Sequence, residues 1–434
     1  MEKSLKSVKS SSLKMRTLSS AEKNSALDEF AKIVKESSDF LLTENQKDLK
    51  DQEGKITQSL YQRLKLDQGK INQLVQGILD LKNIEDPTGK LLSQTKIDND
   101  LILQKTTVAI GVIGVIFESR PDVIPQILSL ILKSGNSVIL KGGKEAIHSN
   151  KAFMSLVEKL NHKISVLPKD WAILLDSRED VKQMLSYSQY VDLVIPRGSN
   201  ELVSYVMNST KIPVLGHADG VCHIYLDKNA DIKKSIPIIV DSKVQYPAAC
   251  NAVETLLVHE EMAKSFFPLF SQAINENQIT IKACPKTHAF LKDSLRANEE
   301  DWSTEYGDQT LSVKVVSNIE SAIDHINQYG SHHTDCILSE DKGSQSLFLS
   351  SIDSSSVFVN ASTRFADGFR YGFGAEVGIS TAKTHARGPV GLDGLVIYKY
   401  QLFGNGQIVK DYTGDNPKKF LHQKIPTQKK EQEK

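Results

Sequence analysis

Residues 108–141, VAIGVIGVIFESRPDVIPQILSLILKSGNSVILK, decide the fold. The apolar run Val108–Phe117 predicts a buried strand. Pro121–Lys133 predicts an apolar helix that ends at the Ser-Gly-Asn turn, and Ser137–Lys141 predicts a second buried strand. A strand, a helix and a strand in this order predict a βαβ unit and therefore a parallel sheet.

The alternation continues on both sides of this stretch. A helix is expected at His148–Leu160, with strands at Val191–Pro196 and Pro213–Leu215. A second alternating region begins near residue 222, with strand candidates CHIYLD, TLLVH, VKVV, CILS and SSVFVN. The whole chain is therefore predicted to be α/β.

The two ends of the chain have different patterns. Residues 19–36 predict an amphipathic helix capped by Ser19 or Ser20, and helical sequence continues to about residue 84. After a turn at 86–89, residues 90–107 predict two strands. Near the other end, segments 395–402 and 407–412 flank Gly-Asn-Gly and predict a hairpin, followed by a polar tail from residue 424.

Composition excludes several classes of protein. The 434 residues carry 53 Lys+Arg and 53 Asp+Glu, which argues against a nucleic-acid binder. Four cysteines without metal-ligand spacing argue against a disulfide scaffold or zinc site and favour a reducing compartment. The longest apolar run, 108–117, is too short for a membrane span, which needs roughly 20 residues. The Ser/Lys-rich N-terminus is interpreted as a segment leading into a helix rather than as a transit peptide.

Common ligand motifs are missing. No GxGxxG follows a strand and opens a helix, and no GxxxxGK[ST] loop occurs. No HExxH is present, and the adjacent His332 and His333 would point apart on a strand, so no metal is expected.

Cys250, in YPAACNAVE (246–254), is the first candidate for chemistry. It follows a Pro-containing loop and precedes a predicted short helical turn, whose N-terminus would stabilise a thiolate. The alternative is a small buried apolar residue, the commoner role of free cysteine. Cys222, in an apolar run, fits that buried role better.

Two further segments carry cations suited to anionic ligands. Lys141, Gly142 and Lys144 lie at the carboxyl end of a predicted strand, where open α/β sheets bind ligands. A solvated turn is the alternative. Four arginines are candidates for phosphate or carboxylate, and each alone is more often structural. They are Arg120, Arg364, Arg370 and Arg387.

These segments, in this order, resemble the γ-glutamyl phosphate reductases, which belong to the aldehyde dehydrogenase superfamily. The resemblance rests on GVIGVIFESRPDV, SGNSVILKGGKE, VIPRG, GVCHIYLD, PAACNAVETLLV, AIDHINQYGSHHTDCI and VNASTRFADG with GFGAEVGIS and HARGPVGL. It extends from about residue 19 to residue 400.

The resemblance implies an aldehyde dehydrogenase-like fold with three parts. Residues 1–85 and 107–221 would form a Rossmann-like NADP-binding domain, and residues 222–385 an α/β catalytic domain. Residues 86–106 and 386–423 would form a β-flap for oligomerisation, before a disordered tail at 424–434. This superfamily binds nicotinamide dinucleotides without GxGxxG.

The resemblance also implies roles for individual residues. Cys250 matches the catalytic cysteine, and Arg120, Asn251, Arg364 and Arg387 are candidates for the oxyanion or the substrate. The remaining matches concern the cofactor NADPH. They are Lys141, Gly142 and Lys144 for the adenosine ribose and its phosphate, Arg197, Gly198 and Ser199 near the pyrophosphate, and Glu305 for the nicotinamide ribose.

One departure from the superfamily pattern concerns the reaction. Hydrolytic aldehyde dehydrogenases carry a glutamate base in an ELGGK-like segment, where this chain has GHADGVCHI. Without a base to activate water, the site is poorly suited to hydrolyse a thioester. A reductase of an acyl phosphate needs no such base, because phosphate is the leaving group. The expected activity is NADPH-dependent reduction of γ-glutamyl phosphate to glutamate-5-semialdehyde, the second step of proline biosynthesis, through a thioacyl intermediate on Cys250.

Two alternatives remain at this stage. One is a hydrolytic NAD(P)-dependent aldehyde dehydrogenase, and the other is a catalytically silent scaffold of the same fold. The expected setting is cytoplasmic. We expect a homo-oligomer that acts on a small molecule and contacts the glutamate kinase, without nucleic acid or membrane.

Overall fold

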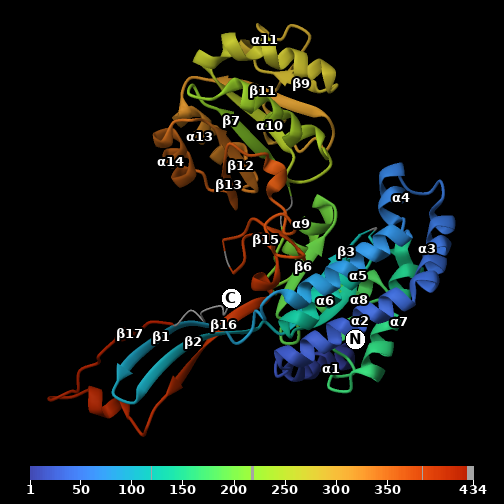
Figure 1. The fold of residues 1–434 in the computed structure, drawn as a ribbon, viewed down its shortest axis with the longest axis vertical. Coiled ribbons are helices and arrows are strands. Elements are labelled where there is room, and N and C mark those ends of the chain that lie inside the picture. Colours follow the sequence, from blue (N-terminus) through green and yellow to red (C-terminus); the bar gives the residue numbers. More distant parts are fainter. Residues whose placement is uncertain (119, 217–218, 384, 428–434) are drawn as a thin grey trace. The chain divides into compact units, whose positions relative to one another are not determined.

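The computed structural model describes residues 1–118, 120–216, 219–383 and 385–427, in two compact units (Figure 1). Unit 1 comprises Met1–Gly198, Val206–Val214 and Gly391–Lys434. Unit 2 comprises Ser199–Tyr205 and Leu215–Val390.

Unit 1 begins with five helices. They are α1 (Glu2–Met15), α2 (Ser20–Glu36), α3 (Ser38–Gln52), α4 (Gln58–Leu64) and α5 (Gln68–Asn83). The expected cap of α2 is confirmed, since the Ser19 side chain and Glu22 form a capping box. The N-terminal segment is itself a helix: α1 buries Leu5, Val8 and Met15.

A parallel sheet of order β5-β4-β3-β6 follows, as the βαβ pattern predicted. Its strands are β3 (Val112–Phe117), β4 (Ser137–Lys141), β5 (Ala172–Leu174) and β6 (Leu193–Arg197). The helices between and after them are α6 (Val123–Ser134), α7 (Ile147–Lys163), α8 (Arg178–Ser186) and α9 (Asn200–Ser209). A short 3₁₀ helix, η1 (Lys144–Ala146), follows the carboxyl end of β4.

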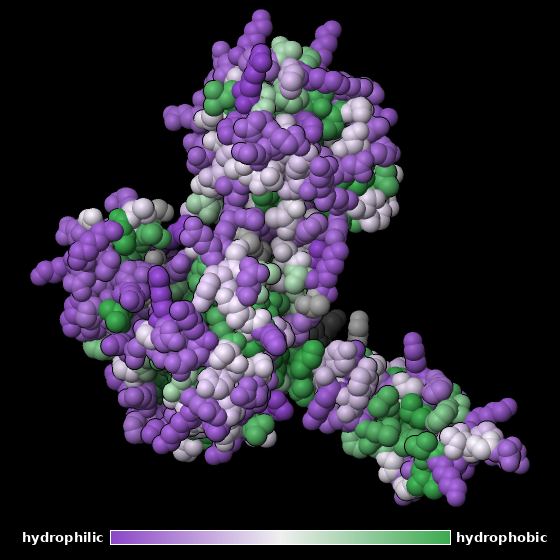
Figure 2. Space-filling model, turned by 180° about the vertical axis from the view of Figure 1, so that it is seen from behind, coloured by the Kyte–Doolittle hydropathy of each residue, from purple (hydrophilic) through white to green (hydrophobic). Residues whose placement is uncertain are grey.

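A second sheet of unit 1, here called the flap, is antiparallel. Its order is β16-β2-β1-β17, built from β1 (Leu91–Asp98), β2 (Leu101–Ala109), β16 (Val396–Phe403) and β17 (Gln423–Ile425). Two 3₁₀ turns, η4 (Leu392–Leu395) and η5 (Val409–Tyr412), flank β16. Apolar side chains gather on the flap surface (Figure 2), among them the exposed Leu92, Leu402 and Phe403.

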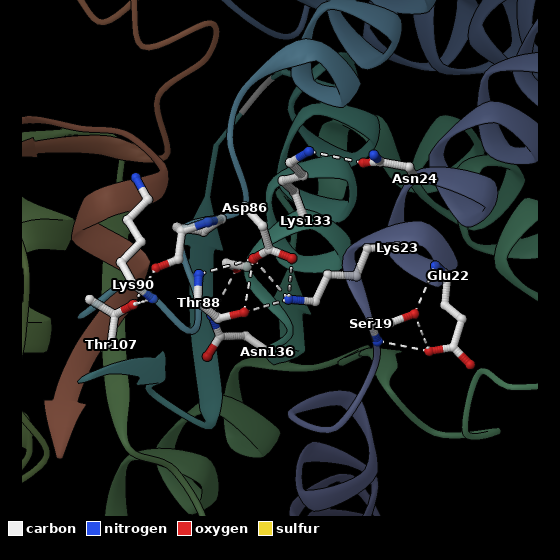
Figure 3. A network of polar contacts seen from close by, with 12 residues as sticks. Ser19, Glu22, Lys23, Asn24, Asp86, Thr88, Lys90, Thr107, Lys133 and Asn136 are labelled. Carbon is white, nitrogen blue, oxygen red and sulfur yellow. Dashed lines mark hydrogen bonds and ion pairs between the residues drawn. The ribbon is translucent and has the colours of Figure 1, made fainter. Parts of the chain in front are cut away.

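A buried polar network anchors the start of the flap (Figure 3). Lys23, only 1% exposed, donates from Nζ to Asp86 Oδ2 (3.0 Å) and Thr88 Oγ1 (2.7 Å). The Thr107 hydroxyl donates to Pro87 O (2.7 Å). Helix α2 therefore holds the turn at 86–89 through a hydrogen-bonded ion pair, and Thr107 near the end of β2 is bonded to that turn.

Several sequence predictions in unit 1 were wrong. Val108–Phe117 is not one strand, because β2 ends at Ala109 against β16 and β3 begins at Val112, whose N–H donates to Asp192 Oδ2 (2.8 Å). Segment 213–215 makes only an isolated bridge, Val194 to Val214.

The C-terminal predictions were also wrong in part. No hairpin joins 395–402 to 407–412, since β16 pairs with β2 instead and 409–412 is a 3₁₀ turn. Gln407 Nε2 donates to Asn99 O (2.9 Å), which holds the segment after β16 against the β1–β2 turn. The expected tail does not begin at 424, because Lys424 and Ile425 pair with β1. Residues 428–434 of that tail lie outside the described residues.

Unit 2 has a seven-stranded sheet of order β10-β9-β11-β8-β7-β12-β13 in which every pair of neighbours is parallel. Its strands are β7 (Cys222–Leu226), β8 (Val253–His259), β9 (Thr280–Ala283), β10 (Leu295–Arg296), β11 (Thr310–Val316), β12 (Thr334–Leu338) and β13 (Ser356–Val359). All five predicted strands of this region are confirmed, and β9 and β10 are additional.

Helices cover this sheet. They are α10 (Ile232–Val244), α11 (Glu260–Glu276), α12 (Pro285–His288), α13 (Ile319–Tyr329) and α14 (Lys342–Ser351). Helix α11 buries Phe266, Phe267 and Phe270 in the core on the sheet. Smaller elements are η2 (Glu300–Ser303), η3 (Thr363–Phe365) and a two-stranded ladder of β14 (Gly378–Ser380) and β15 (Gly388–Val390).

Candidate active site

Cys250 lies in the turn between α10 and β8 of unit 2. The turn is closed by backbone bonds from Ala249 N to Tyr246 O (3.2 Å) and from Ala252 N to Ala249 O (2.8 Å). The predicted helical turn after Cys250 is wrong, because β8 begins at Val253. A helix N-terminus therefore does not supply the charge that would stabilise the thiolate.

The surroundings of Cys250 keep its thiol protonated at neutral pH. The side chain is half-buried. Burial and the carboxylates of Glu305 and Glu376 raise the pKa of Cys250 to about 12, while the Arg364 guanidinium lowers it. The thiolate is the nucleophilic form, so a reaction at Cys250 requires a positive charge or a base to act on the thiol.

Gly220 fixes the backbone next to Cys250. A Cβ built on Gly220 would lie 2.3 Å from Cys250 O and 2.5 Å from Cys250 Cα, so no larger residue fits. The Gly220 N–H donates to Glu305 Oε2 (2.9 Å), and Asn200 Nδ2 lies 3.5 Å from the same oxygen. Glu305 is therefore held against the segment that packs on the cysteine.

Asn251 links the cysteine turn to η3. It is 3% exposed and its Nδ2 donates to Ala366 O (2.8 Å). One of its two amide hydrogens is thus committed to a loop carbonyl, and its role as an oxyanion donor stays a prediction. Glu376 accepts a hydrogen bond from Gly368 N (2.9 Å). The second carboxylate that acts on the thiol is therefore also bonded to the backbone of a loop.

The four candidate arginines are in different settings. Arg364 is 8% exposed and lines a cavity with Arg370. Arg387 donates to the carbonyl (3.1 Å) and carboxylate (3.3 Å) of Asp353. In unit 1, Arg120 pairs with Asp122 at 3.2 Å and has a half-exposed side chain. Among the four, Arg364 is the one whose charge acts on the Cys250 thiol.

A separate cavity of unit 1 lies at the carboxyl end of β4. Its lining includes Lys141, Gly142, Lys144 and Asn150. A Cβ on Gly142 would lie 2.3 Å from Asn150 Nδ2. Burial lowers the pKa of Lys141, whose ammonium donates to Gly142 O. The three predicted residues of this strand end are thus brought together.

The other predicted cofactor residues occur at the end of β6. Arg197 is its last residue, and Gly198 and Ser199 precede α9. Ser199 Oγ accepts a bond from Leu202 N (3.4 Å), within the first turn of that helix.

Sequence reasoning missed a buried ion pair close to the cysteine turn. Lys243 Nζ of α10 lies 2.6 Å from Glu254 Oε2 of β8, and both side chains are fully buried. Burial raises the pKa of Glu254 to about 8, and Lys243 opposes this shift. A glutamate inside the apolar strand VETLLVH was the available signal, since a buried charge requires a partner.

Removing the Glu305 charge should make Cys250 more reactive. In Glu305→Gln, the amide can still accept from Gly220 while the charge is lost, so the pKa of the thiol falls and iodoacetamide alkylation at pH 8 speeds up several-fold. Arg364→Gln should slow the alkylation of Cys250. Peptide mass spectrometry of Cys250 gives the rates, and the exposed Glu340→Gln is the control. Equal rates in Glu305→Gln and the wild type would show that Glu305 does not act on the thiol.

The described residues contain no helix long and apolar enough to cross a membrane. Within the same part of the chain, no group of three or more His, Cys, Asp or Glu side chains is arranged to hold a metal ion.

Comparison with known proteins agrees with this arrangement. The model of the aldehyde dehydrogenase family matches residues 1–288. The γ-glutamyl phosphate reductase of Brachyspira hyodysenteriae is 49% identical over 97% of this chain and 98% of its own. That of Pelotomaculum thermopropionicum is 51% identical over 96% of both chains.

Solved structures give the same result. The crystal structure of γ-glutamyl phosphate reductase from Thermotoga maritima superposes with a TM-score of 0.91 at 37% identity, covering 94% of this chain and 99% of that one. An acetylating aldehyde dehydrogenase from Geobacillus thermoglucosidasius shares the fold, with a TM-score of 0.65 at 14% identity over 94% of this chain and 97% of its own. The chain therefore belongs to the γ-glutamyl phosphate reductases of the aldehyde dehydrogenase family.

Proposed function

We propose that this chain reduces γ-glutamyl phosphate to glutamate-5-semialdehyde and phosphate with NADPH, as the second step of proline biosynthesis from glutamate. The observation that carries the proposal is the combination of half-buried Cys250 with the buried guanidinium of Arg364, whose charge acts on the thiol. A nucleophile and a fixed positive charge that favours its thiolate form are what attack on an acyl phosphate needs.

Cys250 is the nucleophile in this mechanism. Its thiol must lose a proton to solvent, and Arg364 favours this loss while the nearby carboxylates oppose it. The sulfur lone pair forms a bond to the acyl carbon, the bond from that carbon to the phosphoryl oxygen breaks, and phosphate leaves with the electron pair. The Cys250 N–H and one side-chain donor, from among Arg120 and Asn251, would stabilise the oxyanion.

The cavity at the end of β4 fits the adenosine end of a nicotinamide dinucleotide. Gly142 lets the backbone pass close to the Asn150 side chain, and Lys141 and Lys144 supply two cations for a phosphate-bearing ribose. Arg197, Gly198 and Ser199 would meet the pyrophosphate at the start of α9, and Glu305 the nicotinamide ribose. When bound, the reduced nicotinamide supplies the hydride that takes the thioester to the aldehyde.

Most of the residues proposed for the cofactor belong to unit 1, whereas Ser199, Glu305 and the nucleophile Cys250 belong to unit 2. The exposed apolar residues of the flap support its assignment as the surface through which copies of the chain associate. Preference for NADPH over NADH, a contact with the glutamate kinase and a cytoplasmic location stay predictions.

A hydrolytic aldehyde dehydrogenase is the second candidate, because Glu305 and Glu376 are carboxylates whose charge reaches the thiol. Each accepts a backbone N–H, from Gly220 and Gly368 respectively, which favours a structural role over that of a base.

Phosphate dependence separates the two candidates. Pyrroline-5-carboxylate, in equilibrium with the open semialdehyde, is supplied with NADP, and reduction is followed by absorbance with and without inorganic phosphate. We expect steady turnover only with phosphate. Equal rates without phosphate would mean that water releases the acyl group, and the hydrolytic assignment would replace this one.

A further inference from the structure

The cavity beside η3 in unit 2 combines both signs of charge. It is lined by Asp241, Gln245, Arg364, Phe365 and Arg370. Asp241 belongs to the last turn of α10 and Gln245 follows that helix, while the other three come from the segment after β13. The cavity therefore joins residues that are far apart in the sequence.

The guanidinium groups in this cavity are held in place by the protein. Arg364 Nε donates to Gln245 Oε1 (2.9 Å), and its carbon Cζ lies 5.8 Å from the centre of the Tyr246 ring. Arg370 Nη1 donates to the carbonyl of Arg364. Among the described residues, no acceptor takes a hydrogen bond from the terminal nitrogens of Arg364. A pre-organised fork of this kind suits a bidentate carboxylate.

The cavity is connected to the nucleophile. Asn251, the residue after Cys250, donates from Nδ2 to Ala366 O (2.8 Å), two residues after Arg364. In γ-glutamyl phosphate, three carbon–carbon bonds of about 1.5 Å separate the acyl carbon from the α-carbon. A substrate under attack by Cys250 thus carries its amino-acid end a short distance from the sulfur.

The negative charge of Asp241 decides which part of the substrate the cavity suits. A phosphate dianion would meet the two arginines but would be repelled by the Asp241 carboxylate. The α-amino acid end of the substrate carries an ammonium and a carboxylate, so it can use all three charges. Charges of both signs match a zwitterion and disfavour an anion alone.

We propose that this cavity binds the α-amino acid end of the substrate, with Asp241 at the ammonium group and Arg364 and Arg370 at the α-carboxylate. This assignment rests on the proposed function and deepens it by locating the specificity for a glutamyl group. The phosphate is then bound elsewhere.

Substrates that lack one charge test this assignment in the reverse reaction with NADP and phosphate. Glutarate semialdehyde lacks only the amino group, and 4-aminobutanal lacks only the carboxylate. The readout is the ratio of kcat/KM for glutamate semialdehyde to kcat/KM for each analogue. Ring–chain equilibria of the substrates cancel when the ratio of a variant is divided by that of the wild type.

Asp241→Asn should lower the ratio of glutamate semialdehyde to glutarate semialdehyde about tenfold or more, mainly through KM, because a charged hydrogen bond to the ammonium is lost. Arg370→Gln should lower the ratio to 4-aminobutanal in the same way. Lys234→Met, which replaces an exposed residue of α10, is the control and should leave both ratios at the wild-type value.

Unchanged ratios in both variants, with the wild type still dependent on phosphate, would overturn the assignment and leave the proposed function standing. A lower KM for phosphate in Asp241→Asn with unchanged ratios would overturn it too, and would make the cavity the phosphate site. Wild-type turnover that needs no phosphate would instead refute the proposed function itself.

Discussion

Cys250→Ser should lower phosphate-dependent turnover at least about a thousandfold, because serine is a far weaker nucleophile than cysteine. Binding of NADPH should stay close to wild type, since the proposed cofactor cavity belongs to unit 1. Steady-state rates and a fluorescence titration with NADPH measure the two effects.

Cys284→Ser is the matched control for that experiment. Cys284 is buried, and its sulfur caps α12 by accepting from Thr287 N (3.5 Å), a position where serine is favoured. We expect Cys284→Ser to keep wild-type activity. A Cys250→Ser enzyme with near wild-type turnover would refute the nucleophile.

Lys243→Met should destabilise the fold by about 3–5 kcal/mol, the usual cost of breaking a buried ion pair by removing one partner. Lys243 and Glu254 are both fully buried and 2.6 Å apart, and they join α10 to β8 on either side of the cysteine turn. Urea unfolding followed by far-UV circular dichroism measures the change in the free energy of unfolding.

The cost of this substitution should depend on pH. Burial raises the pKa of Glu254 to about 8 from 4.5 in the wild type, and losing Lys243 removes the interaction that opposes this. In the folded state the Glu254 carboxyl holds a proton that the unfolded state releases. The free energy of unfolding therefore falls as pH rises above 4.5. Both proteins lose this contribution as pH rises towards 8, and only the variant goes on losing it above pH 8, so we expect the destabilisation of Lys243→Met to be larger at about pH 9 than at about pH 7.

Two variants define the comparison. Lys234→Met, at an exposed position of α10, breaks a pair with Glu340 (3.1 Å) and should cost at most about 1 kcal/mol. Lys243→Met combined with Glu254→Leu removes both buried charges and should recover most of the loss. If Lys243→Met costs no more than Lys234→Met, the buried pair does not stabilise the cysteine turn.

Local pattern was enough to predict most of the fold. The strand Ser137–Lys141 and the cap at Ser19 depend on neighbouring residues, and both are confirmed. The C-terminal hairpin was wrong because Gly404-Asn405-Gly406 favours a turn, while β16 finds a better partner in β2, almost three hundred residues earlier. Strand pairing between distant segments is not visible in a local pattern.

The residues of the candidate site also differ in whether a local pattern could group them. Lys141, Gly142 and Lys144 are adjacent in sequence, and the structure brings them to one cavity. Glu376 lies far in the sequence from Cys250, and Asp241 and Gln245 at the end of α10 lie far from Arg364, so tertiary packing alone brings each set together. The expected helix N-terminus at Cys250 failed because the turn leads directly into β8.

A single-turnover measurement tests the central claim most directly. Wild-type enzyme is mixed with NADP and pyrroline-5-carboxylate without phosphate in a stopped-flow absorbance experiment, and Cys250 is then analysed by peptide mass spectrometry. The account predicts a burst of about one NADPH per chain, a γ-glutamyl thioester on Cys250, and renewed turnover when phosphate is added. Continued turnover without phosphate, or a burst that leaves Cys250 unmodified, would contradict it.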